Sequence, residues 1–283
     1  MAETAIDYLA IGYVAKDLTA DGPQMGGTVA YSTLTAKAFD YLPGLVTACG
    51  PDLDLSPLAG IPVVSVPSPL STTFENIYGP GGRTQYLRAR AAPLTTVAVP
   101  AAWRRARIVH LAPLANELDD PDLGLFASAF IGMTPQGWLR QMDEAGRVRT
   151  VPDSWLGAER VLSQASAVVL SIDDLGGDWA VAERWANWAP ILVVTQGAQG
   201  CTVFARGQGR RQFPAAVQPE LDPTGAGDVF AAAFFINLYE TDDPWASARF
   251  ANQVAALAVT RPGLQGVPAP EEIGYCRARA ALA

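Results

Sequence analysis

Basic residues, cysteine and histidine are all scarce in this 283-residue sequence. Lys and Arg total 20 against 28 Asp and Glu, and the net charge of −8 argues against a nucleic-acid-binding protein or one that binds anionic membranes. Cys49, Cys201 and Cys276 lie far apart without a C-x-x-C pair, so we expect buried apolar residues rather than a zinc or redox site. His110 is the single histidine and ends an apolar run, which leaves a Ser-His-Asp triad without support.

Long apolar runs are also missing. None approaches the roughly 18 residues that cross a bilayer, and the first residues contain acids but no basic leader segment, so we expect a cytoplasmic protein. Hydrophobic residues nevertheless make up 49% of the chain, which is ample for a core. At this length the chain could form one large α/β domain or two small ones.

Short apolar segments alternate with helical patterns, as in a parallel sheet that is covered on both faces. The expected strands are residues 8–11, 46–48, 108–111, 168–170 and 191–194, with a hairpin at 200–204 and 210–213. The expected helices are residues 28–39, 155–162, 175–188, 225–239 and 244–260. Residues 62–92 are rich in β-branched and aromatic residues without a helical period, which predicts extra strands outside the main sheet.

The most informative motif is Asp222-Pro-Thr-Gly-Ala-Gly-Asp228, which an apolar helical segment follows. A glycine-rich turn before a helix exposes backbone N–H groups to an anion, so Gly225, Ala226 and Gly227 could hold phosphate oxygens. Asp228 would repel that phosphate unless it accepts a proton from an attacking hydroxyl, which indicates phosphoryl transfer to an alcohol. The alternative is a plain turn in which Asp228 stabilises the helix dipole.

The whole motif resembles the signature of the ribokinase-like (PfkB) carbohydrate kinases. This resemblance implies that residues 1–283 form a single domain. It implies a three-layer α/β/α fold with a mainly parallel central sheet and a small β lid, here formed by about residues 13–24 and 62–92. It implies ATP and Mg²⁺ as cofactors, with Asp228 as the catalytic base and residues Gly225, Ala226 and Gly227 as the anion hole. By the same analogy, Thr224 borders the nucleotide, and a monovalent cation such as K⁺ lies near Asp222 and Thr224.

Other segments carry the resemblance further. Asp17, Gly26 and Gly27 resemble the N-terminal sugar-binding motif of the family, although an exposed loop acid and a flexible turn are the alternatives. The nucleotide site is expected at Thr195, Gly197, Gly200 and Asn252. For Asn252, a solvent-facing helix residue is the alternative.

Ser171 and Asp174 stand where many relatives have Asn-x-x-Glu, a motif that organises magnesium-bound water. The shorter aspartate favours metal contact through water. Ser171 followed three residues later by an acid is also a capping-box pattern. The two interpretations are compatible.

The acceptor is expected to be a small polyol or sugar, because three segments together resemble the myo-inositol kinase branch of the family. They are Ser71 to Asn76 with Tyr78, Thr134 to Arg140, and Leu221 to Asp228. The expected contacts are Asp17, Glu75, Asn76, Gln136 and Arg140, each of which could equally be a polar surface residue. A nucleoside kinase with a Phe74–Tyr78 aromatic clamp and a non-catalytic sensor remain alternatives. The short lid leaves the choice between monomer and homodimer open.

Overall fold

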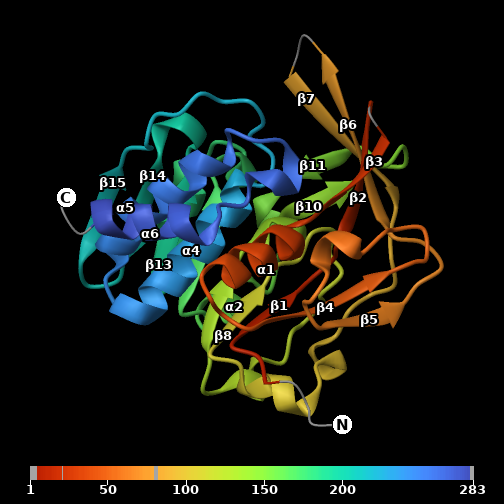
Figure 1. The fold of residues 1–283 in the computed structure, drawn as a ribbon, viewed down its shortest axis with the longest axis horizontal. Helices are drawn as coiled ribbons and strands as arrows, with labels where there is room; N and C mark the ends of the chain where they lie inside the picture. The colour runs from red at the N-terminus through yellow and green to blue at the C-terminus, as the bar shows by residue number, and fades with distance from the viewer. Residues whose placement is uncertain (1–4, 21, 80–81, 281–283) are drawn as a thin grey trace.

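The computed structural model describes residues 5–20, 22–79 and 82–280, and for residues 78–79, 82–83 and 280 it describes the backbone alone. In these residues nine strands form a central sheet in the order β15-β14-β13-β12-β9-β8-β1-β4-β5 (Figure 1). All neighbours pair in parallel except β13–β14 and β14–β15, which form the antiparallel hairpin at one edge. The strands are β1 (Tyr8–Ile11), β4 (Pro43–Cys49), β5 (Val63–Pro67), β8 (Ile108–Leu111), β9 (Phe130–Met133), β12 (Ala167–Ser171), β13 (Ile191–Thr195), β14 (Cys201–Ala205) and β15 (Gly209–Phe213).

Strand β1 shows why the sheet is buried on both faces. All four of its residues are buried, because successive side chains point to opposite faces and each face has a helical layer. Tyr8 and Ala10 pack into one apolar cluster, and Leu9 and Ile11 pack into the other. The first cluster includes residues of α1 (Thr28–Ala38), α4 (Ala226–Thr241), α5 (Pro244–Ala258) and α6 (Pro270–Ala280). The second includes residues of α2 (Ala158–Leu162) and α3 (Trp179–Ala186), which completes the three-layer α/β/α arrangement.

The expected strands and helices are all present, although their ends differ: β4, β12 and β13 are longer than expected, and α2 and α3 are shorter. The pattern did not identify β9, which is only four residues long and contains a glycine that packs under Phe235. Helix α6 was also missed. Residues 63–67 differ from the lid assignment, because β5 pairs in parallel with β4 at the edge of the central sheet. The predicted helix at 155–162 begins only at Ala158, since Pro152–Ser154 forms a separate 3₁₀ turn.

Four strands form the lid, in the order β3-β2-β6-β7. They are β2 (Ala15–Thr19), β3 (Gly22–Gly26), β6 (Thr72–Gly79) and β7 (Gly82–Ala89), and Figure 1 shows them projecting from the body of the molecule. The hairpin of β10 (Arg140–Met142) and β11 (Val148–Thr150) lies between lid and body. Asp52 anchors the lid: its carboxylate pairs with Lys16 of β2 and accepts the backbone N–H of Ser71 at 2.8 Å, just before β6.

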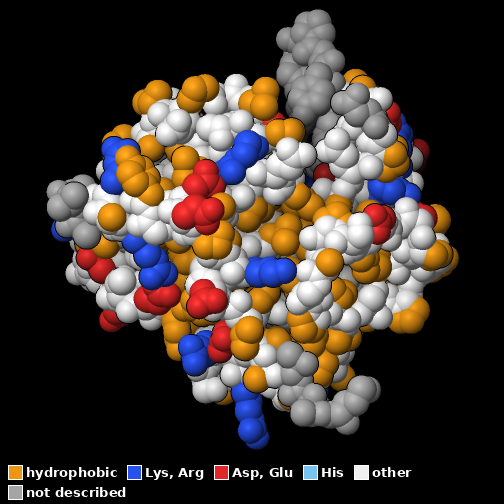
Figure 2. Space-filling view, viewed as in Figure 1, with side chains coloured by type: hydrophobic (Ala, Val, Ile, Leu, Met, Phe, Trp, Pro, Cys, Tyr) orange, Lys and Arg blue, Asp and Glu red, His pale blue; other side chains and the backbone are white. Residues whose placement is uncertain are grey.

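The remaining sequence expectations concern charge and polarity. No helix in the described residues is long and apolar enough to span a membrane. On the face shown in Figure 2, acidic and basic side chains are interspersed rather than gathered by sign. Cys201 and Cys276 are buried free thiols, as predicted, and Cys49 is half-buried. His110 is a core histidine: its ring bonds Tyr8 at 2.8 Å and Thr134 at 2.9 Å, and burial lowers its pKa to about 3, so it is neutral at ordinary pH.

Candidate active site

The N-terminus of α4 is open towards a cavity. Gly225 precedes the helix with φ of 79°, in the left-handed region, and a Cβ there would lie 2.1 Å from the ring of Tyr31. No side chain caps the helix, and within the described residues the amides of Gly225 and Gly227 have no hydrogen-bond acceptor. A Cβ at Gly227 would meet nothing within 4 Å. These amides are therefore available to an anion.

Asp228 follows in the first turn of α4, beside these amides. Burial raises the pKa of its carboxyl to about 6; a hydrogen bond from Thr28 and the charge of Arg140 oppose this, whereas Asp174 and Asp17 reinforce it. A carboxyl with that pKa is mostly ionised at neutral pH yet is a stronger base than an exposed aspartate. Asp228 is therefore suited to accept a proton from a hydroxyl.

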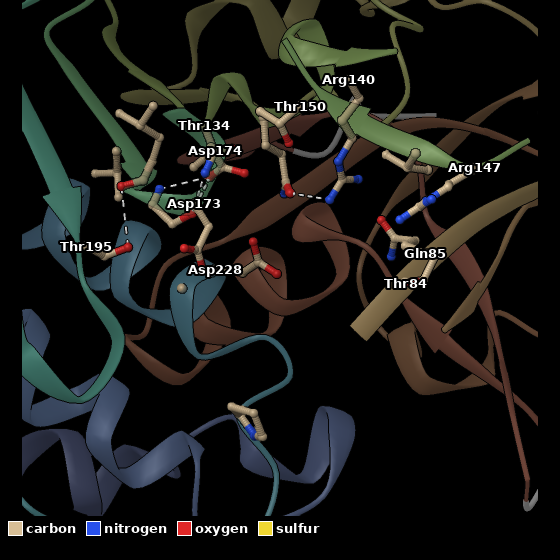
Figure 3. A pocket seen from close by; sticks show the side chains of 17 residues that line it. Thr84, Gln85, Thr134, Arg140, Arg147, Thr150, Asp173, Asp174, Thr195 and Asp228 are labelled. Carbon is tan, nitrogen blue, oxygen red and sulfur yellow. Dashed lines mark hydrogen bonds between the residues drawn. The ribbon is translucent and has the colours of Figure 1, made fainter. Parts of the chain in front are cut away.

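A cavity of about 460 Å³ contains Asp228 and Gly227 on one wall. Its volume suits a small ligand. In Figure 3 the labelled Asp173, Asp174, Asp228 and Thr195 lie on one side, and Arg140, Arg147, Gln85 and Thr84 lie on the other. The first group comes from the ends of central strands and from α4. The second comes from β7 and the β10–β11 hairpin.

A hydrogen-bonded chain links the two sides. Arg140 donates to the carbonyl of Leu114 at 2.9 Å and to the side-chain oxygen of Gln136 at 2.8 Å. The nitrogen of Gln136 donates to the Thr28 hydroxyl at 2.9 Å, and Thr28 in turn bonds Asp228. Gln136 and Arg140, both predicted from the sequence, thus lie in the cavity wall.

Asp17 lies on β2, with its carboxylate against Gly26 of β3, where a Cβ would be 2.0 Å from Asp17 Oδ2. Gly27 begins α1 with φ of 92°, and a Cβ there would be 2.6 Å from the carbonyl oxygen of Tyr13. Only glycine fits at either position without displacing these groups. The glycine pair thus allows the lid strand β2 and helix α1 to lie close to the site. The negative charge of Asp17 helps to raise the pKa of Asp228.

Ser171 and Asp174 form the predicted capping box. Asp174 Oδ2 accepts from the amide and hydroxyl of Ser171, each at 2.9 Å, and the Asp174 amide donates to the Ser171 hydroxyl at 3.1 Å. Asp174 also lines the cavity. In the described residues no group of three or more acidic, histidine or cysteine side chains could hold a metal. Mg²⁺ usually takes one or two carboxylates together with substrate phosphates and waters, so the residues present fit it.

The residues predicted to border the nucleotide do not all line the cavity. Thr195, at the end of β13, lines the cavity. Gly197 and Gly200 shape the following turn, and a Cβ at Gly200 would lie 2.0 Å from the carbonyl oxygen of Phe213. Asn252 is 6% exposed and donates to the carbonyls of Phe213 and Pro214, both at 3.2 Å. Its amide is therefore used inside the protein, and the solvent-facing alternative was wrong.

Asp222 connects two loops at the same end of α4. Its oxygens accept the amides of Thr224 at 2.9 Å and Gly263 at 2.8 Å. Although burial opposes it, hydrogen bonds from the Thr224 side chain and from these two amides lower the pKa of Asp222. Both oxygens therefore have protein partners, and K⁺ at this position stays a prediction.

The lid residues predicted to bind substrate face different surroundings. Glu75 pairs with Arg88 at 2.6 Å on the lid surface. Asn76 accepts a hydrogen bond at 3.0 Å from Gln85, which itself lines the cavity. Phe74 is 2% exposed and packs in the core, so its ring is not open to a ligand. The side chain of Tyr78 lies outside the described residues.

Several cavity residues and one buried acid carry no motif in the sequence. Thr84, Gln85 and Thr150 line the cavity from strands β7 and β11, and Arg147 lines it from the residues just before β11. Glu117 is 1% exposed, and its carboxylate accepts the amides of Tyr13, Leu114 and Ala115 at 2.7 to 2.9 Å. These amides follow β1 and β8, so Glu117 fixes the ends of both central strands. A buried glutamate after a strand has no sequence signal of its own.

Comparison with known proteins agrees with this geometry. Residues 158–272 match the model of the pfkB family carbohydrate kinases. Ribokinase of Bacillus subtilis is 37% identical over 94 residues, which are 33% of this chain and 32% of that protein. The match thus spans about a third of this curated relative.

Solved structures match over nearly the whole chain. A pyrophosphate-dependent kinase in the ribokinase family, complexed with a pyrophosphate analogue and myo-inositol, has a TM-score of 0.79 at 22% identity, covering 94% of this chain and 99% of its own. A putative ribokinase II from E. coli, complexed with ATP and Mg²⁺, has a TM-score of 0.73 at 18% identity, covering 97% and 99%. The whole chain therefore has the fold of these ribokinase-family structures, and residues 158–272 are similar to the pfkB family of carbohydrate kinases.

Proposed function

We propose that the protein transfers the terminal phosphoryl group of ATP to a hydroxyl of a small sugar or cyclitol. The observation that carries this proposal is Asp228, a carboxylate with a pKa of about 6 placed beside the free amides of Gly225 and Gly227. A base and an anion hole at one helix N-terminus serve an alcohol that attacks a phosphate. The similarity of residues 158–272 to the pfkB family of carbohydrate kinases supports the same activity.

In the proposed reaction, the acceptor hydroxyl oxygen forms a bond to the terminal phosphorus as the bond from that phosphorus to the leaving phosphate oxygen breaks. Asp228 accepts the hydroxyl proton. The amides of Gly225 and Gly227 donate to the oxygens of the transferred group. When bound to the donor phosphates, Mg²⁺ neutralises their charge, and Asp174 is the residue that would hold it through water.

The test is an ATP-consumption assay with ribose, fructose, myo-inositol and adenosine as acceptors. Asp228→Asn should lower kcat at least about 100-fold, because it removes the base, while the nucleotide Kd changes little. Asp178→Asn is the matched control: Asp178 caps α3 outside the cavity, and asparagine caps equally well. Near-normal turnover of Asp228→Asn would reject Asp228 as the base. Binding of an acceptor without any turnover would favour a sensor.

A cyclitol or sugar acceptor suits the cavity better than a nucleoside. The cavity wall offers hydroxyls, amides and charged groups, and among the described residues no aromatic side chain lines it. Stacking on a base therefore has no platform there. Asp17→Ala should raise the acceptor KM far more than the ATP KM, since Asp17 is proposed to accept bonds from acceptor hydroxyls. A preference for adenosine in the panel would overturn the polyol proposal.

Pyrophosphate is a second candidate donor, and one contact favours it. The amide of Asn252, expected beside the adenine, instead donates to the carbonyls of Phe213 and Pro214. Pyrophosphate has no adenine, so it does not need a contact with that amide. Side-by-side assays with ATP and pyrophosphate, each with Mg²⁺, decide between them. Asn252→Ala should raise the KM for ATP if ATP contacts this residue, and leave the pyrophosphate KM unchanged.

A further inference from the structure

The cavity beside Asp228 has charge of opposite sign at its two ends. Asp173, Asp174 and Asp228 line the end where phosphoryl transfer is proposed. Arg140 and Arg147 line the end formed by the β10–β11 hairpin, and Figure 3 shows both side chains reaching towards the cavity. Arg140 already bonds Leu114 and Gln136, but a neutral sugar does not need the second guanidinium, that of Arg147. The basic end therefore calls for a separate explanation.

The backbone of Arg147 is held rigidly. Its amide donates to the carboxylate of Asp143 at 2.9 Å, and its carbonyl accepts from the Asp143 amide at 3.1 Å. It also bridges Tyr86 of lid strand β7. Next to it, Gly146 accepts the amide of Leu87 at 2.8 Å, and a Cβ on Gly146 would lie 2.5 Å from the carbonyl oxygen of Leu87. The close contact between hairpin and lid thus fixes where the side chain of Arg147 begins.

The guanidinium of Arg147 has no internal use. In the described part of the chain it forms no ion pair or side-chain hydrogen bond, whereas Arg149 nearby pairs with Asp143 at 3.8 Å and is not among the residues that line the cavity. Gln85, Thr84 and Thr150 line the cavity with it and add neutral hydrogen-bonding groups. Gln85 is oriented by its hydrogen bond to Asn76. A guanidinium that extends from a fixed backbone and has such groups around it suits a carboxylate or a phosphate.

We propose that the acceptor is a sugar or cyclitol that carries an anionic substituent, and that Arg147 determines this specificity. The substituent, a carboxylate or a phosphate, pairs with Arg147 at the lid end while the reacting hydroxyl lies at Asp228. This inference rests on the proposed kinase function. To that function it adds that the acceptor is negatively charged and that Arg147 recognises this charge.

The experiment compares acceptors in matched pairs: fructose with fructose 6-phosphate, glucose with gluconate, and myo-inositol with inositol monophosphate. At least one anionic member should have a kcat/KM roughly 10-fold or more above its neutral partner, the effect of one charge-assisted contact. Arg147→Gln should lower kcat/KM for that acceptor by roughly 10- to 100-fold through KM. It should leave the donor KM and the neutral acceptors unchanged. Arg149→Gln is the matched control and should change neither.

Each result has one consequence. A preference for the phosphorylated acceptors shows that the site binds phosphate, and a preference for gluconate shows that it binds a carboxylate. A neutral member preferred in every pair, or an Arg147→Gln variant that keeps the preference, overturns the inference but leaves the kinase function in place. A raised donor KM in Arg147→Gln also overturns it, by assigning Arg147 to the donor. Absence of turnover with every acceptor counts against the kinase function instead. In that case the anion site is tested by calorimetric binding of the same acceptor pairs. The inference then requires that the anionic member binds more tightly than its neutral partner and that Arg147→Gln abolishes this difference.

Discussion

The side-chain nitrogen of Gln136 donates a hydrogen bond to the hydroxyl of Thr28 at 2.9 Å. The oxygen of the same amide accepts from Arg140 at 2.8 Å, so both ends of Gln136 have protein partners. Because the Thr28 oxygen accepts from Gln136, its own proton is directed to Asp228. The sequence predicted a substrate contact for Gln136, whereas these bonds favour a role in positioning the base.

The first prediction concerns this chain of bonds. Gln136→Met frees the Thr28 hydroxyl to turn away, which removes a bond that stabilises the ionised carboxyl of Asp228. The acidic limb of the kcat/KM profile should therefore move to higher pH. Thr28→Val should move it in the same direction, and the double variant should show no additional shift. A purely structural role predicts lower stability with an unmoved profile.

The second prediction is the pH dependence of the unaltered protein. Asp228 acts as a base only when ionised, so kcat/KM should rise as pH passes through about 6 and then level off. His110 does not contribute, because burial lowers its pKa to about 3. Rates with a saturating donor between pH 5 and 8 provide the measurement. A profile that is flat across pH 6 would remove Asp228 from the base role.

The third prediction is that the buried carboxyl of Asp228 lowers the free energy of unfolding when it is ionised. Its pKa is raised from 3.8 to about 6, so the folded state binds the proton more tightly than the unfolded chain, and stability falls as pH rises through this window. Asp228→Asn has no charge to bury and should be more stable at pH 8, by up to about 3 kcal/mol, with a smaller difference at pH 5. Urea unfolding at the two pH values measures this. An equal difference at both would contradict the linkage.

The fourth prediction concerns Gly227. A Cβ there meets nothing within 4 Å, so Gly227→Val should fold, yet its side chain would occupy the space beside the free amides. Turnover should fall at least about 100-fold, as when a group essential to an anion hole is lost. Gly274→Val is the control, because Gly274 is a helical glycine of α6 that also has no neighbour within 4 Å. Normal turnover in a folded Gly227→Val variant would show that phosphate binds elsewhere.

The fifth prediction concerns Glu117. Replacing a carboxylate oxygen by an amide NH₂ turns a donor towards backbone amides that need an acceptor. Glu117→Gln should destabilise the protein by about 2–4 kcal/mol, because it leaves buried groups unpaired. Glu183→Gln is the control: Glu183 pairs with Arg210 at 3.4 Å on the surface, where an ion pair contributes about 0–1 kcal/mol. Equal unfolding midpoints for the two variants would contradict the role of Glu117.

The parts of the molecule that could be predicted are those with a local cause. The glycine pattern around Gly225 and the Ser171–Asp174 spacing each specify a backbone geometry within a few residues, and both are present. Arg147 and Gln85 could not be identified, because their place in the cavity depends on a hairpin docking onto a strand about 60 residues earlier in the chain. The internal hydrogen bonds of Asn252 could not be predicted for a similar reason, because its partners lie in β15 and the loop after it.

The docking of the β10–β11 hairpin has a consequence for assembly. An open strand edge is a template on which a second chain can add a strand. At β7, the amide of Leu87 is already bonded to Gly146, and Tyr86 bridges Arg147. The middle of this lid edge is therefore closed to another copy of the protein. A lid-to-lid dimer that extends the β-sheet would have to form through β3, the opposite edge of the lid.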